Sequence, residues 1–176
     1  MKKRFLILFS VICIFSVLIF VIFNFLIGFK KYETDIEKYS QVYDLESALV
    51  FAIARVESDF EASAVSSSGA RGVMQIMPIT AKWIAGELGD EYSDDNLFDP
   101  ETNIRYGCFY LRYLLDKFDD LWVVVAAYNA GESVVKSWVG EDGLLNEDLI
   151  DYDETKKYVS RVRMFYRLYK NLENAI

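Results

Sequence analysis

The N-terminal apolar run divides this chain into two parts. No charged residue occurs from Phe5 to Phe29, and nearly every position there is Phe, Leu, Ile or Val. Such a run is long enough to cross a bilayer as one helix. It ends in "FNFLIGFKK", without the small residues of a signal-peptide cleavage site, so we expect it to be retained. The basic residues 2–4 favour a cytoplasmic N-terminus, which predicts a single-pass anchor over residues 1–31 and places residues 32–176 outside the cytoplasm.

Residues 32–176 have the length of one ordinary domain, which can bury a core without disulfides or metals. The whole chain holds 19 Lys and Arg residues against 27 Asp and Glu residues. Five of the basic residues precede Tyr32, so the outer part keeps 14 basic residues and has a net charge of −13. This charge argues against nucleic acid as a partner and against binding an anionic surface by bulk charge.

The chain contains no histidine and two cysteines. The missing histidine excludes a Ser-His-Asp or Cys-His triad and the commonest zinc sites. Cys13 lies in the apolar run and Cys108 in a predicted helix, so we expect no disulfide between them. Any chemistry must therefore come from carboxylates, hydroxyls, amides and backbone dipoles.

The outer part reads as a succession of helices. Apolar residues recur at helical spacing over residues 33–43, 45–57, 79–88, 99–118, 121–130 and 154–173. Asp99 is placed to cap a helix with Pro100 in its first turn, and Gly131 to end the run "LWVVVAAYNA", which is apolar on all sides. The stretch "SDFEASAVSSSGARGVMQIMP" is rich in Ser, Gly and Ala. We therefore predict an all-α fold with a small irregular or short β insert after the second helix.

Glu57 is the first candidate for chemistry. It follows Ile53 by one helical turn, so it flanks the apolar face at the end of its helix. Burial there and the negative end of the helix should raise its pKa and keep it protonated near neutral pH, as an acid that cleaves glycosidic bonds must be. The alternative is a rim glutamate in a surface ion pair. A second carboxylate is not evident, because Asp59 lies about 200° further around the helix and Glu61 lies in the insert.

Two further stretches hold polar groups suited to a ligand. "GARGVMQIMP" carries Gln75, an amide suited to a sugar hydroxyl or N-acetyl group, with Met77 as an adaptable apolar neighbour. "AAYNAG" places Tyr128 and Asn129 at the end of a buried helix. A plain turn would explain the first stretch equally well, and a plain helix end the second.

Together these motifs resemble the catalytic domain of soluble-type (Slt-like) lytic transglycosylases of bacterial cell walls. "ARVESDFEASAVSSSGARGVMQIMPITA" is similar to the E-S motif followed by G-L-M-Q-x-M-P, with Val73 in place of Leu. "NIRYGCFYLRYLLDKF", "AAYNAGESVVKSW" and "ETKKYVSRV" resemble three more motifs in the same order, with Glu132 where Pro often stands and Lys156 in place of Arg. The resemblance runs from about Ile36 to Tyr169.

The resemblance implies a lysozyme-like fold with a groove for peptidoglycan strands. It makes Glu57 the single acid and base, and it makes Gln75 and the backbone of Met77 sugar contacts. Tyr128 and Asn129 become cleft residues, and Glu154 lies near the groove. The reaction implied is non-hydrolytic cleavage of the β-1,4 bond between N-acetylmuramic acid and N-acetylglucosamine, with the muramoyl 6-hydroxyl as nucleophile. The resemblance implies that neither a metal nor an organic cofactor is needed.

Two other functions stay open at this point. Water could take the place of the 6-hydroxyl, which would make the protein a goose-type-like hydrolytic muramidase. Alternatively, the domain could be a catalytically weak glycan-binding scaffold anchored to the membrane. The predicted location in each case is the bacterial cell membrane with the domain on its extracytoplasmic side. No protein partner, pathway or oligomeric state is indicated by the sequence.

Overall fold

The structure is a computed structural model. It describes residue 9, residues 11–17 and residues 30–174. The chain separates into two compact units, Met1–Glu33 and Thr34–Ile176. The second unit contains the predicted motifs, and the description below concerns its elements.

The predicted membrane-spanning helix must be corrected. Among the residues that the structure describes, no helix is long and apolar enough to cross a membrane. Much of the predicted span, including residues 18–29, lies outside the described residues. The described helical stretch at residues 11–17 rises only about 10 Å at 1.5 Å per residue, whereas the hydrocarbon layer is about 30 Å thick.

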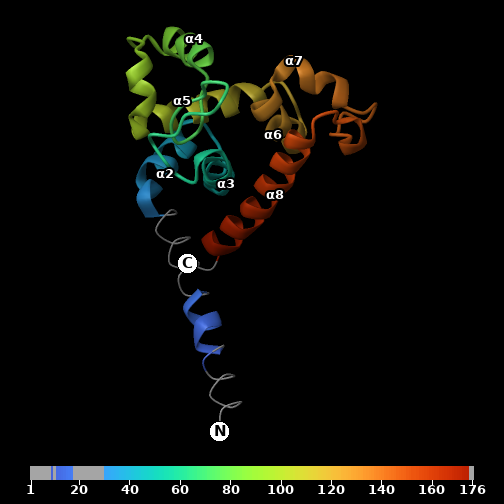
Figure 1. Cartoon of the computed structure of the whole chain (residues 1–176). Coiled ribbons are helices and arrows are strands. Elements are labelled where there is room, and N and C mark those ends of the chain that lie inside the picture. Colours follow the sequence, from blue (N-terminus) through green and yellow to red (C-terminus); the bar gives the residue numbers. More distant parts are fainter. Residues whose placement is uncertain (1–8, 10, 18–29, 175–176) are drawn as a thin grey trace. The chain divides into compact units, whose positions relative to one another are not determined.

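The second unit is helical, and short 3₁₀ turns connect several of its α-helices (Figure 1). Its elements follow in chain order: α2 (Glu33–Val42), α3 (Ser47–Ser58), α4 (Pro78–Leu88), η1 (Asp94–Phe98), α5 (Pro100–Leu115), α6 (Leu121–Ala130), α7 (Glu132–Val135), η2 (Lys136–Trp138), η3 (Glu147–Leu149) and α8 (Asp153–Glu173). The only β pairing among the described residues is three isolated antiparallel bridges: Val65 with Arg71, Arg71 with Ile76, and Val139 with Leu145.

Helix α3 is the centre of the unit. Its residues from Ala48 to Ala54 are all buried, so the helix is enclosed on every side and not along one stripe. The long helix α8 packs against it, and α6, buried from Val123 to Ala127, packs against α8 in turn. The sequence pattern predicted a central helix at residues 121–130. The structure shows that α3 is enclosed as well, because α8 packs on the face of α3 that its amphipathic pattern predicts to be exposed to solvent.

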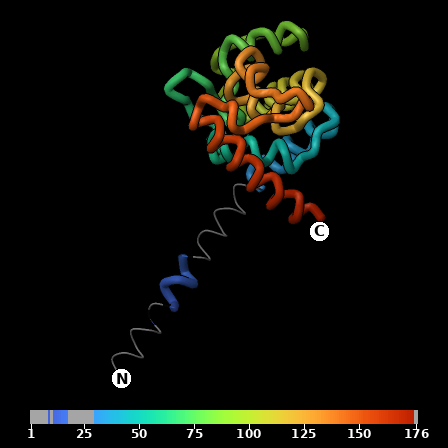
Figure 2. Tube along the Cα trace, turned by 90° about the vertical axis from the view of Figure 1, so that its right-hand side faces the viewer, coloured from blue at the N-terminus to red at the C-terminus, as the bar shows by residue number. Residues whose placement is uncertain are grey.

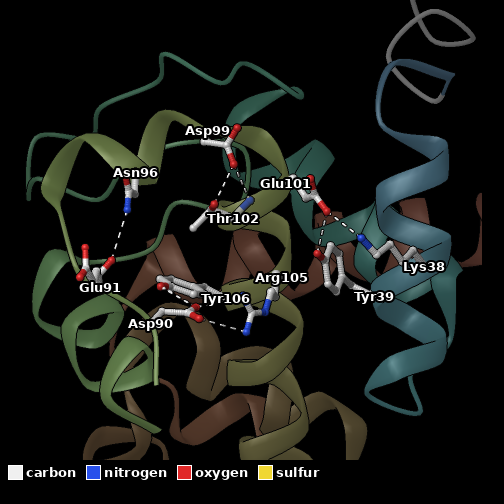
Figure 3. Close-up of polar contacts among 10 residues, drawn as sticks. All are labelled: Lys38, Tyr39, Asp90, Glu91, Asn96, Asp99, Glu101, Thr102, Arg105 and Tyr106. Atoms are coloured by element: carbon white, nitrogen blue, oxygen red, sulfur yellow. Dashed lines mark hydrogen bonds and ion pairs between the residues drawn. The ribbon is translucent and has the colours of Figure 1, made fainter. Parts of the chain in front are cut away.

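Helix α5 begins where its capping residues predict. The Asp99 carboxylate accepts a hydrogen bond from the backbone N–H of Thr102 at 2.9 Å, and Pro100 occupies the first position of the helix (Figure 3). In the first turn of the helix, Glu101 accepts hydrogen bonds from Lys38 at 2.7 Å and from Tyr39 at 2.8 Å (Figure 3). These contacts attach α2 to the start of α5.

The insert after α3 is held in place by one buried side chain of α5. Asn103 accepts a hydrogen bond from the N–H of Met74 at 2.7 Å and donates to the carbonyls of Arg71 and Leu97, each at 2.9 Å. Gly72 permits this approach. Its φ is +79°, and a Cβ at this position would lie 2.4 Å from the Asn103 amide nitrogen. The insert therefore has a defined shape although it forms no named strand.

Candidate active site

Glu57 lies in the last turn of α3, where the helix meets the insert and the start of α8. The insert and the N-terminal end of α8, distant in sequence, lie side by side (Figure 2). The Tyr158 hydroxyl, from α8, donates a hydrogen bond of 2.7 Å to Oε1 of Glu57. Asp59 turns away from this point. It ends α3 in the left-handed conformation and pairs with Arg55 at 2.6 Å on the surface.

The pKa of Glu57 rises from 4.5 to about 7, chiefly because burial removes water from its carboxylate. The hydrogen bond from Tyr158 and the positive charge of Arg161 oppose this rise, whereas the negative charge of Glu154 adds to it. The position of Glu57 at the end of its helix, beside apolar residues, predicted that its pKa would be raised. The opposing contributions from α8 could not be predicted from spacing within α3.

Glu57 lines two cavities that share several of their lining residues. One has a volume of about 370 Å³ and the other about 220 Å³. Both are lined by Glu57, Ser66, Gln75, Asn129 and Glu154. The larger of the two adds Lys157, Tyr158 and Arg161 from α8, and the smaller adds Ser67, Ser68, Ala70, Met77 and Tyr128.

Asn129 also lines two further cavities, in addition to the two that Glu57 lines. One, of about 510 Å³, is bordered by the residues before and at the start of α8, including Asp151 and Glu154. The other, of about 240 Å³, lies between the insert, α4 and α6 and includes Met77, Tyr110 and Tyr128. These two cavities share lining residues with the two cavities that Glu57 lines, and we call the four together the groove.

Gln75 is held in an unusual backbone conformation, with a φ of +50°. Its amide nitrogen donates to the carbonyls of Gly72 at 2.9 Å and Ala64 at 3.2 Å, which uses both of its hydrogens. The amide oxygen has no hydrogen bond recorded with any described residue, so this oxygen is the group that a ligand hydroxyl or N–H can reach.

Met77 precedes α4, and its carbonyl accepts the hydrogen bond of Ala81 N–H at 2.9 Å. Its own N–H makes no recorded hydrogen bond within the described part of the chain. Of the predicted backbone contacts at this residue, the N–H is therefore the group left for a ligand. The side chain is partly exposed at the groove.

Tyr128 and Asn129 connect α6 to the two sides of the groove. The Tyr128 hydroxyl donates to the carbonyl of Met74 at 2.9 Å, and burial raises its pKa well above the ordinary value. The Asn129 side-chain oxygen accepts a hydrogen bond from Thr155 of α8 at 2.8 Å. Both residues line the groove while also holding its walls, so neither is simply the end of a helix.

Glu154 is the second carboxylate in the two cavities that Glu57 lines. It lines three cavities of the groove, including both that contain Glu57. Glu61, which the sequence left as a candidate, accepts hydrogen bonds from Ser63 instead and does not line these cavities. In residues 9, 11–17 and 30–174, no group of three His, Cys, Asp or Glu side chains is arranged to hold a metal ion.

The lining residues that the sequence did not single out include Ser66 from the insert and Lys157, Tyr158 and Arg161 from α8. The three from α8 carry a signal that sequence alone could have given. Positions 154, 157, 158 and 161 recur at helical spacing, so once Glu154 lies at the groove the other three share its face.

Fold and groove together define a lysozyme-like helical domain with one partly buried acid of raised pKa in its cleft. Residues 35–150 match the family described as the transglycosylase SLT domain, and the chain belongs to this family, as its motifs predicted.

Individual relatives agree with this assignment. The chain is 34% identical over 142 residues to the soluble lytic murein transglycosylase of Salmonella typhimurium, which covers 76% of this chain and 22% of that protein. It is 32% identical over 121 residues to the membrane-bound lytic murein transglycosylase C of Haemophilus ducreyi, covering 60% and 32% of the two chains. The relatives thus include soluble and membrane-bound proteins.

A solved structure is similar as well. The X-ray structure of an inactive mutant of the lytic transglycosylase Slt from Pseudomonas aeruginosa superimposes with a TM-score of 0.75 and 33% identity, over 82% of this chain and 24% of that one. This chain therefore spans between about a fifth and a third of the length of the three proteins compared.

Proposed function

We propose that this protein is a peptidoglycan lytic transglycosylase, which cleaves the β-1,4 bond between N-acetylmuramic acid and N-acetylglucosamine and leaves a 1,6-anhydromuramoyl end. The observation that carries the proposal is Glu57, a partly buried carboxyl group with a pKa of about 7 that lines two cavities of the groove. One residue that must serve first as acid and then as base works best when its pKa lies near the working pH.

In the first step Glu57 gives its proton to the oxygen of the scissile glycosidic bond. The protonated form is available at neutral pH because burial disfavours the carboxylate. As the bond breaks, Glu57 becomes negatively charged, and the hydrogen bond from Tyr158 together with the charge of Arg161 stabilises that form. The 2-acetamido oxygen of the muramoyl residue assists at the anomeric carbon.

In the second step the Glu57 carboxylate removes the proton of the muramoyl 6-hydroxyl, which attacks its own anomeric carbon. The nucleophile belongs to the substrate, so its effective concentration is high and the protein need not position a water. The Gln75 amide oxygen and the Met77 N–H would hold the sugar from the insert side. Asn129 and Glu154 would orient it from the opposite wall. The domain would act outside the cytoplasm, where this polymer lies.

Analysis of the products tests the proposal. Purified sacculi digested with the full chain should release muropeptides lighter by one water than their reducing counterparts, when measured by mass spectrometry. Glu57→Gln should reduce this release by at least about a thousandfold, since a general acid and base is lost twice. The similar structure from Pseudomonas aeruginosa is of a mutant that carries glutamine in place of a glutamate, and that mutant is inactive. Undiminished cleavage by Glu57→Gln would remove Glu57 from the mechanism.

The hydrolytic alternative rests on one observation of its own. Glu154 lines the same cavities as Glu57 and could activate a water as the second carboxylate. Reducing muramic acid ends among the products, in place of anhydro ends, would establish the muramidase reaction. Binding of the strands without any cleavage by the wild-type chain would favour the scaffold function.

A further inference from the structure

Two positive side chains line the cavity that holds Glu57. Lys157 and Arg161 are one helical turn apart on α8, and Tyr158 lies between them in sequence. Both border the cavity of about 370 Å³. The proposed reaction with the uncharged sugars needs neither of them to touch the substrate. The charge of Arg161 stabilises the Glu57 carboxylate, but this leaves Lys157, and the presence of both cations in one cavity, without an explanation.

Their lack of partners sets them apart from most other cations of this domain. Of the seven arginines after residue 33, five form ion pairs with carboxylates: Arg55, Arg71, Arg105, Arg112 and Arg163. Neither Arg161 nor Lys157 forms an ion pair with any residue that the structure describes, although the domain has a large excess of Asp and Glu. Two like charges one turn apart also repel each other slightly, so the helix gains nothing from the pair.

With Glu57 protonated, the two cations of the cavity exceed the single negative charge of Glu154, so the cavity presents net positive charge to a ligand beside Glu57. Both sugars of a peptidoglycan strand are uncharged once the lactyl carboxyl group is joined to a stem peptide by an amide bond. The anionic groups of the strand are then the carboxylates of that peptide. A guanidinium and an ammonium group are the side chains that bind carboxylates most strongly, Arg with two parallel hydrogen bonds and Lys as a point charge.

We propose that Lys157 and Arg161 bind a carboxylate of the stem peptide on the muramoyl residue whose glycosidic bond Glu57 cleaves. The inference rests on the proposed function. It makes the protein selective for strands that still carry their peptides. The otherwise acidic domain would repel such stems, and this pair of cations supplies local attraction where the substrate must be positioned.

The test measures binding in the Glu57→Gln full chain, where no cleavage occurs and Arg161 cannot act through the ionisation of Glu57. The probes are glycan oligomers of one length in three forms: with stem peptides, with stems whose carboxylates are amidated, and without stems. Arg161→Ala should weaken binding of the first form about tenfold and Lys157→Ala about threefold, with the other two forms unchanged. Arg161→Lys should retain part of the affinity.

Two matched variants control for the general loss of positive charge. Arg167→Ala and Lys156→Ala remove exposed cations from the same helix that do not line the cavity of Glu57, and they should leave all three dissociation constants unchanged. Equal weakening of all three probes by Arg161→Ala, or no weakening of any, would overturn the proposal. Anhydro products from the wild-type chain together with either of these results would overturn only the stem-peptide site and leave the proposed reaction standing.

Discussion

At the scale of single residues, the chemistry depends on opposing effects at Glu57. Burial alone would hold the carboxyl group protonated and make it a poor base in the second step. The Tyr158 hydroxyl, at 2.7 Å, lowers the cost of the charged form and brings the pKa back toward about 7. Tyr158 is therefore a positioning residue that adjusts one group for two successive roles.

Replacing Tyr158 with Phe should raise the pKa of Glu57 above about 7. The lost hydrogen bond stabilises only the carboxylate, so we expect the alkaline limb of the pH–rate profile to move up by roughly one unit. The maximal rate should fall, because Glu57 is then a weaker acid in the first step and the carboxylate formed in that step lacks the hydrogen bond from Tyr158.

Tyr166→Phe is the matched control for this variant. It removes another tyrosine-to-glutamate hydrogen bond from α8, the 2.7 Å bond to Glu46, at an exposed position outside the groove. Its profile should equal that of the wild type. A profile of Tyr158→Phe that also equals the wild type would contradict the assigned role.

At the scale of elements, the insert owes its shape to a few buried contacts. The side chain of Asn103 makes three hydrogen bonds to insert and η1 backbone, and the Tyr128 hydroxyl adds a fourth contact at Met74. Gly107 contributes by its lack of a side chain, because a Cβ there would lie 2.9 Å from the Cβ of Met74 and closer still to its sulfur. Gln75 lies between these contacts, so its orientation depends on them.

We expect Asn103→Ala to destabilise the protein by roughly 3 kcal/mol, since the buried N–H of Met74 and the carbonyl of Leu97 lose this partner, whereas the carbonyl of Arg71 keeps its bond from the N–H of Ile76. Thermal unfolding measures this directly. Asn96→Ala is a suitable comparison, because Asn96 is exposed and its side chain makes one long hydrogen bond of 3.4 Å to the carbonyl of Glu91 (Figure 3). That variant should cost less than about 0.5 kcal/mol. Equal losses in the two variants would show that Asn103 does not hold the insert.

At the scale of the folded domain, the site exists because α3 and α8 pack together. That packing buries α3 on all sides and brings Tyr158 to Glu57 across 101 positions of sequence. The same burial has a cost. The native state holds a proton on Glu57 over a pH range in which the unfolded chain, with a pKa near 4.5, has released it.

The stability of the wild type should therefore fall as the pH rises from about 4.5 to about 7. A native pKa raised by this amount lowers the free energy of unfolding by about 3 kcal/mol, and this loss is complete above pH 7. Glu57→Gln cannot ionise, so it should match the wild type at pH 4 and exceed its unfolding free energy at pH 8. Urea unfolding of both proteins at the two pH values measures the difference. A constant difference across this range would mean that Glu57 has an ordinary pKa.

The sequence alone determined the helices, the cap at Asp99, the end of α6 at Gly131 and the family, because these depend on spacing between near neighbours. It also identified Glu57, Gln75, Met77, Tyr128, Asn129 and Glu154 as candidates. A local pattern reports only local geometry, however. The predicted membrane span rested on the length of an apolar run, and no described helix supports it.

Only the tertiary structure decided which groups meet. It enclosed α3, brought Glu154, Tyr158 and Arg161 from α8 to Glu57, and turned Asp59 to the surface. The pKa of Glu57 is a sum of burial and of charges carried by a segment about a hundred residues away. Contacts over such separations leave no periodic trace in the chain, and for this reason the chemistry of the site depends on the fold as well as on the motifs.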